Sequence, residues 1–146
     1  MKHTLAVVAA AVVLAGCSTG MSSSAPPVAL KLTEVNTSSN VFYFSGPVDL
    51  QYQLAITNPT PEPMTLTRLD LRTTGPGAYF LRTAATPMNL TIAPNTTSTY
   101  TLSVWGHARG GFIASTEPVL IRGIAYIKSP SGSFTKLFTE NVVPGP

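Results

Sequence analysis

The chain has few charged residues and a single cysteine. Asp, Glu, Lys and Arg make up 10% of its 146 residues, whereas hydrophobic residues make up 44%. Chains that stay disordered combine high charge with low hydrophobicity, so this composition predicts a folded protein. One cysteine excludes an intramolecular disulfide, and a formal net charge of +3 is too weak a field to indicate nucleic-acid binding. We therefore expect one folded domain, without a disulfide framework and without a nucleic-acid partner.

Residues that carry chemistry are also scarce. The histidines are His3 and His107, and the six acidic residues are dispersed. No ligand pair stands at a spacing typical of metal sites, so we expect no metal. A hydrolase or glycan-modifying enzyme would need His107, but the Gly-rich segment 106–111 favours a solvated loop histidine there. We expect no catalytic residue and no enzyme, with the His107 enzyme as the less favoured alternative.

The first sixteen residues have the pattern of a secretory signal peptide. Lys2 and His3 precede an apolar run from Leu5 to Leu14. A helix of about ten residues rises about 15 Å, which is too short to span a hydrocarbon core of roughly 30 Å. The residues that follow, Leu14-Ala15-Gly16-Cys17, resemble the lipobox of bacterial lipoproteins. The resemblance implies that residues 1–16 are removed by a signal peptidase that recognises Leu14, Ala15 and Gly16.

The same resemblance implies that Cys17 carries a lipid. The sulfur would receive a diacylglycerol and the new amine an acyl chain, with no other cofactor. Two or three chains on one residue hold a protein on a bilayer much more firmly than a single chain does. Ser18 follows the cysteine, and in lipoproteins of Gram-negative bacteria this favours the periplasmic face of the outer membrane. Residues 17–27 are rich in Ser, Gly and Pro, which predicts a flexible tether in the cell envelope.

From Val28 onward the hydrophobic pattern has a period of two. Apolar residues take every even position from Val48 to Ile56, as in a strand with one buried face. Thirteen Pro and eleven Gly, scattered along the chain, argue against long helices. About seven to nine short antiparallel strands separated by turn signals predict an all-β sandwich better than a barrel with a ligand cavity. We place this sandwich domain at residues 28–143.

Two local features and a core follow from the same pattern. The parity changes between Met64–Leu66 and Leu69–Leu71, which predicts a β-bulge near Thr67 or Arg68. Residues 129–132, Ser-Pro-Ser-Gly, predict a hairpin turn. The predicted core consists of the inward-facing apolar residues of these strands: Val48, Leu50, Tyr52, Leu54, Ile56, Leu69, Leu71, Leu90, Ile92, Tyr100, Leu102, Val104, Ile121 and Ile124.

Several motifs resemble those of the LEA14-like domain, also called the WHy (water-stress and hypersensitive response) domain. The motifs are Ile56-Thr57-Asn58-Pro59, Leu66-x-x-Leu69-Asp70-Leu71, Leu90-x-Ile92-Ala93-Pro94-Asn95, Val119-x-Ile121-Arg122-Gly123 and Gly132-x-Phe134. The sequence departs from the family at Thr60, where the family has the last residue of its Asn-Pro-Asn signature. The resemblance implies an immunoglobulin-like or fibronectin-III-like sandwich and a non-enzymatic stress-related or interaction module.

Two groups of residues are candidates for contact with a partner. Trp105, Phe112 and Ile113 lie around the irregular segment and either form an exposed apolar patch or cap the core. A patch of arginines toward anionic lipid or polysaccharide is conceivable, but their spacing favours separate solvent-facing positions for Arg68, Arg72, Arg82, Arg109 and Arg122. We therefore expect a membrane-anchored lipoprotein that acts as a non-enzymatic binding or structural module. Its partner would be an envelope protein or a glycan, and a WHy-type stress protectant is the alternative.

Overall fold

The fold is an all-β sandwich. The computed structural model describes residues 26–37, 45–82, 84–110 and 117–143. Across these ranges the chain forms eight strands and no helix, so the predicted fold class is confirmed. The strands are β1 (Ala29–Thr37), β2 (Gly46–Asn58), β3 (Met64–Thr73), β4 (Tyr79–Leu81), β5 (Ala84–Ile92), β6 (Thr96–Ala108), β7 (Val119–Ser129) and β8 (Gly132–Val142).

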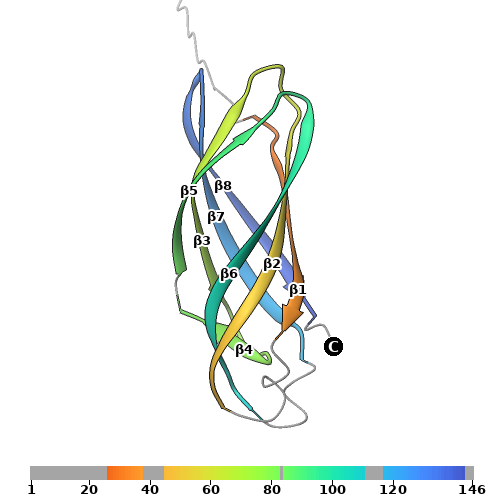
Figure 1. Ribbon diagram of the computed structural model, residues 1–146, viewed down its shortest axis with the longest axis vertical. Helices are drawn as coiled ribbons and strands as arrows, with labels where there is room; N and C mark the ends of the chain where they lie inside the picture. Colours follow the sequence, from red (N-terminus) through yellow and green to blue (C-terminus); the bar gives the residue numbers. More distant parts are fainter. Residues whose placement is uncertain (1–25, 38–44, 83, 111–116, 144–146) are drawn as a thin grey trace, which may run out of the picture.

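The strands form two four-stranded sheets in which every pairing is antiparallel. Sheet A has the order β1-β2-β6-β4, and sheet B has the order β5-β3-β7-β8. Figure 1 shows the long strands running along the long axis of the molecule, with β1 at the side of the sandwich where β8 lies. Each strand turns one row of side chains inward, so the core fills the space between the sheets.

The predicted core is largely confirmed. Most of its residues are buried, whereas Leu90 and Tyr100 are half-buried at the margin of the core. The assignment of Ile124 to the core is wrong. Ile121 and Ile124 are three positions apart on β7, and residues an odd number apart on a strand point to opposite faces. Because Ile121 is fully buried, Ile124 lies on the outer face of sheet B.

The predicted bulge is present in β3. The register shifts between Leu66 and Arg68 in the pairings of β3 with both β5 and β7. The apolar residues on both sides of the bulge are at most 2% exposed: Met64 and Leu66 before it, and Leu69 and Leu71 after it. The extra residue therefore keeps both apolar pairs in the core, as the change of parity predicted. The predicted hairpin is also present, since β7 and β8 pair as far as Ser129 and Gly132.

Asn58 joins the turns at one end of the sandwich. Its side chain is fully buried, and its Oδ1 accepts hydrogen bonds from the amide N–H of Thr60 at 3.0 Å and from the Thr60 hydroxyl at 2.8 Å. Its Nδ2 donates to the carbonyl oxygens of Glu62 at 2.8 Å and Ala93 at 3.2 Å. One amide thus satisfies carbonyls of the β2–β3 turn and of the β5–β6 turn, which is a physical reason for Asn at the first position of the Asn-Pro motif.

Gly123 makes room for an aromatic ring on the neighbouring strand. It lies directly opposite Phe138 in the pairing of β7 with β8, with both positions on the inward face. A Cβ atom at Gly123 would lie 2.1 Å from Cζ of Phe138, far inside van der Waals contact. The ring therefore occupies the space that a side chain at position 123 would take, an arrangement known to compensate for glycine in sheets.

We expect Gly123→Ala to lower the free energy of unfolding by about 1–3 kcal/mol, because the added methyl group forces the Phe138 ring or the strand to move. Urea denaturation measures this change in the free energy of unfolding. Gly46→Ala is the matched control, since a Cβ there meets nothing within 4 Å. In the double variant with Phe138→Ala the clash disappears, so its destabilisation should be smaller than the sum of the two single effects. Strict additivity would contradict this account.

Candidate functional site

The outer face of sheet A is mainly polar and carries few charged residues. Gln51 and Gln53 of β2 lie opposite Ser103 and Thr101 of β6, and all four are exposed. Nearer the end of the same strands, the hydroxyls of Thr57 and Thr97 are joined by a hydrogen bond of 2.8 Å. A face of hydroxyl and amide groups offers hydrogen bonds to a partner without the desolvation cost of burying charges.

Trp105 stands on this face near the far end of β6. Its side chain is 70% exposed, so it does not cap the core. It lies opposite Asp49 in the pairing with β2, and Asp49 accepts a hydrogen bond from the hydroxyl of Ser103. An exposed indole beside a carboxylate and a hydroxyl combines an apolar stacking surface with polar groups at its edge. The other two residues of the predicted patch, Phe112 and Ile113, lie outside the described residues.

His107 is the last polar residue of β6. The prediction that it lies in a loop is wrong, because β6 continues to Ala108 by pairing with both β2 and β4. Its ring stacks on Phe80, with centroids 5.1 Å apart, and its Nε2 lies 3.4 Å from the hydroxyl of Ser45. Among the described residues no carboxylate forms a hydrogen bond or ion pair with His107. Within the described ranges, His107 thus has a serine beside it but no hydrogen-bonded acidic residue that would orient the ring.

A row of hydrogen-bonded side chains crosses the inner face of sheet A, and the sequence analysis did not predict it. The Tyr52 hydroxyl donates to that of Tyr79 at 2.8 Å, which in turn donates to Oε2 of Glu34 at 2.6 Å. Burial is the main cause that raises the pKa of Glu34, and it also raises the pKa of both tyrosines. Because the two tyrosines are almost fully buried, this row satisfies hydroxyl groups that would otherwise be buried without partners.

The outer face of sheet B carries three of the five arginines that the sequence analysis considered separate. Arg68 forms a two-pronged ion pair with Asp70, with both N–O distances 2.6 Å, and its guanidinium lies 4.9 Å from the centre of the Tyr126 ring. The hydrogen bonds from Arg68 lower the pKa of Asp70. Arg72 and Arg122 lie directly opposite each other in the pairing of β3 with β7. These three arginines are solvent-facing, as expected, but Arg72 and Arg122 are neighbours, whereas Arg68 lies four positions further along β3.

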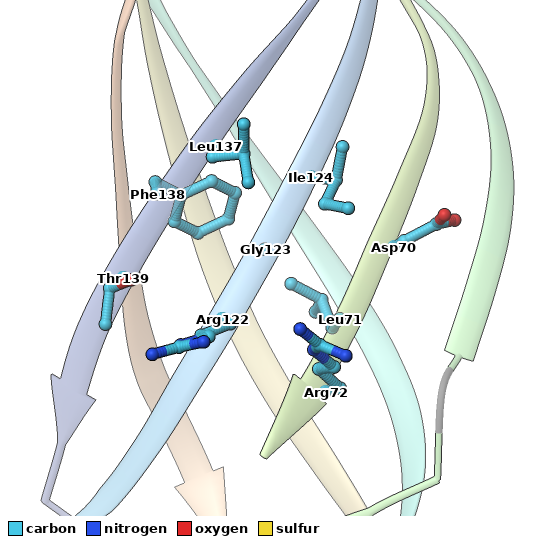
Figure 2. A pocket seen from close by; sticks show the side chains of 9 residues that line it. All are labelled: Asp70, Leu71, Arg72, Arg122, Gly123, Ile124, Leu137, Phe138 and Thr139. Carbon is cyan, nitrogen blue, oxygen red and sulfur yellow. The ribbon is translucent and has the colours of Figure 1, made fainter. Parts of the chain in front are cut away.

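A pocket of about 330 Å³ opens on this face. Figure 2 shows its lining, with Arg72 and Arg122 toward one end and Ile124 and Leu137 toward the other. The remaining lining comes from Asp70, Leu71, Gly123, Phe138 and Thr139. Small-molecule sites are commonly about 300–1,000 Å³, so this pocket is at the lower end of that range.

Two other kinds of feature concern residues 26–37, 45–82, 84–110 and 117–143. No group of three or more His, Cys, Asp or Glu residues that could hold a metal ion is found there. The same ranges contain no helix that is long and apolar enough to cross a membrane. The predicted signal peptide at 1–16, Leu14, Ala15 and Gly16 within it, and Cys17 lie outside the described residues.

Comparisons with known proteins show similarity of fold only. No family model and no curated protein matches the chain. It is similar to structural genomics target SoR45, with a TM-score of 0.53 and 19% identity over 82% of this chain and 86% of that one. It is similar to a protein from Archaeoglobus fulgidus, with a TM-score of 0.52 and 9% identity over 77% and 91%. It is also similar to a protein described as a candidate late embryogenesis abundant (LEA) protein, with a TM-score of 0.50 and 11% identity over 77% and 68%.

We expect the Glu34 carboxyl to make stability depend on pH. Burial raises its pKa in the folded state above the ordinary value of 4.5, so the folded protein holds the proton more tightly than the unfolded chain does. This contribution is fully present below about pH 4.5 and is lost as pH rises through the folded pKa. Glu34→Gln removes the titration and keeps an acceptor for Tyr79.

The measurement is urea denaturation of Glu34→Gln and the unaltered chain at pH 4 and pH 7. The variant should gain stability relative to the unaltered chain on going from the lower to the higher pH. Glu62→Gln, at an exposed position, is the control. Its difference in stability from the unaltered chain should be the same at pH 4 and at pH 7. Equal stability differences at the two pH values would refute a raised pKa at Glu34.

Proposed function

We propose that this protein is a lipid-anchored, non-enzymatic binding module of the cell envelope. The anchor is Cys17, in the sequence Leu14-Ala15-Gly16-Cys17 after an apolar run that is too short to span a bilayer. The sandwich follows the tether and would be held at the periplasmic face of the outer membrane. Its interior is filled with side chains, so a partner meets the domain on its outer faces.

The observation that carries the binding role is the exposure of Trp105. Tryptophan is among the residues most enriched at the energetic centres of interfaces, and here its side chain is 70% exposed on an ordered strand. Holding the indole on a strand limits the entropy that is lost when a partner covers it. Asp49 and Ser103 beside it supply polar groups at the edge of the contact. This chemistry suits an envelope protein or a glycan, which also present apolar patches bordered by hydroxyl or amide groups.

A stress-protective role of the LEA14/WHy type is the second candidate. It is supported by the similarity of fold to the LEA protein, with a TM-score of 0.50, and by the buried Asn58 of the Asn-Pro motif. At 11% identity this similarity concerns the fold, and its support for the role is by analogy of fold, which is why this role is the second candidate. An enzyme that uses His107 is less favoured, because the serine beside it at 3.4 Å has no acidic residue completing the set in the described part of the chain.

The anchor predicts that the protein incorporates radiolabelled palmitate in growing cells and sediments with membranes. Cys17→Ser should abolish both, because the thiol is the acceptor of the diacylglycerol, whereas Ser18→Ala should leave the label in place. Label that persists after Cys17→Ser would exclude this site of attachment.

The binding role predicts that Trp105 touches a partner in intact cells. A photoreactive amino acid placed at position 105 should give a discrete adduct with an envelope protein or with peptidoglycan. Position 99, normally an exposed Thr on the same face of β6, is the matched control and should give little. Equal adducts at both positions, or none at position 105, would count against a binding face at the indole.

A further inference from the structure

The pocket on sheet B lies between two rows of outward-facing side chains. In the register of β3, β7 and β8, one row consists of Asp70, Ile124 and Leu137, and the other of Arg72, Arg122 and Thr139. The row between them consists of Leu71, Gly123 and Phe138. The side chains of Leu71 and Phe138 point inward, and Gly123 has none. The backbone of this row therefore forms the floor of a hollow that runs across the strands.

One wall of this hollow concentrates positive charge. Arg72 and Arg122 are exposed and directly opposite each other, an arrangement of like charges that disfavours the pairing of strands. The lining contains one carboxylate, that of Asp70, and it already accepts two hydrogen bonds from Arg68. In the described ranges neither Arg72 nor Arg122 forms an ion pair. The two guanidiniums therefore have their donors available to an anion.

The other wall begins with Asp70 on β3 and is apolar on β7 and β8. Ile124 and Leu137 lie directly opposite each other, and Leu137 is 71% exposed, more than any other large hydrophobic residue among those described. Their place on an outer sheet face is unusual, because alternation of a sheet normally puts polar residues there. Figure 2 shows these aliphatic groups on the other side of Gly123 from the guanidiniums. The hollow thus has a cationic wall, and the wall that faces it is aliphatic at Ile124 and Leu137.

We propose that this pocket binds a phosphate monoester that carries an alkyl chain, with the phosphate on Arg72 and Arg122 and the chain against Ile124 and Leu137. Two guanidinium forks suit a phosphate better than a carboxylate. One fork already satisfies the two oxygens of a carboxylate, whereas a phosphate monoester offers three peripheral oxygens and a charge near −2. The site is on the opposite sheet from Trp105 and does not depend on the lipid at Cys17.

The occupant we assign is a single amphiphile in solution, not the lipid bilayer of the anchor. Ala29, where β1 begins, pairs with Thr57 near the Asn58 end of β2. Arg72 lies near the opposite end, since the Thr73 hydroxyl accepts from the amide of Leu81, and Leu81 pairs with Gly106. The chain therefore enters β1 at one end of the sandwich, and the arginines are near the other end.

The test is a titration of the full chain carrying Cys17→Ser with octyl phosphate, followed by amide chemical shifts in NMR spectra. The amides of Leu71, Gly123 and Phe138 should shift and saturate, while the indole N–H of Trp105 should not move. Arg72→Gln and Arg122→Gln should each weaken binding about tenfold or more, since a hydrogen bond between charged groups is lost. Both positions are exposed, so the folded state should persist.

Matched variants and ligands separate this site from general attraction. Lys128→Gln removes the same charge from the same face of β7 outside the pocket, and should change affinity less than twofold. Leu137→Ser should weaken octyl phosphate but not inorganic phosphate. Octanoate and octyl glucoside should bind more weakly than octyl phosphate. The proposal is overturned if Lys128→Gln weakens binding as much as Arg122→Gln, if inorganic phosphate binds as well as octyl phosphate, or if only vesicles containing phosphatidic acid are bound.

Discussion

A single extra residue in β3 decides which side chains reach the two faces of sheet B. With the bulge between Leu66 and Arg68, both Leu66 and Leu69 enter the core, although an uninterrupted strand would turn them to opposite faces. The same shift puts Arg68, Asp70 and Arg72 on the outer face. Without it, either the apolar residues or the charged ones would lie on the wrong side of the sheet, at a cost of several kcal/mol for the buried charges. The basic face exists because the core demands the bulge.

The two outer faces offer partners different chemistry. Sheet A presents hydroxyl and amide groups with one exposed indole, Trp105. Sheet B presents arginines around a hollow with an aliphatic end. The ion pair between Arg68 and Asp70 on this face neutralises the one carboxylate in the lining of the pocket. It also holds the Arg68 guanidinium against the Tyr126 ring. The attraction for an anion is thereby left to Arg72 and Arg122.

Features that follow from period and parity could be predicted from the sequence. The bulge in β3, the hairpin at 129–132 and most of the core depend on residues close together in the chain, so the pattern was sufficient. Ile124 is the exception: its side chain is as hydrophobic as that of Ile121, but the odd spacing between the two puts it on the outer face. The signal at His107 was obscured by neighbouring glycines, whereas pairing with both β2 and β4 keeps the segment in a strand.

Features that depend on register between distant strands could not be predicted in the same way. Glu34 and Tyr79 are 45 positions apart and lie on the two edge strands of sheet A, so they meet only because both side chains reach across its inner face. The same reason explains why Arg72 and Arg122 were expected to be separate, since nothing local in the sequence pairs them. A buried tyrosine does require a hydrogen-bond partner, so Tyr52 in the predicted core was a signal that some polar group had to reach it.

The position of the two faces along the strands bears on how an anchored domain would meet its partners. Trp105 pairs with Asp49, whereas Ala29, just after the predicted tether, pairs with Thr57 on the same β2 strand. Eight residues of strand correspond to about 27 Å at roughly 3.4 Å per residue. In Figure 1 the arginine-bearing ends of β3 and β7 lie toward the β4 end of the sandwich, away from the β7–β8 hairpin. If a lipid at Cys17 holds the tether, both candidate surfaces are on the half of the domain remote from the attachment point. That placement keeps both surfaces clear of the point where the chain enters β1, so a partner that covers either surface does not meet the start of the domain.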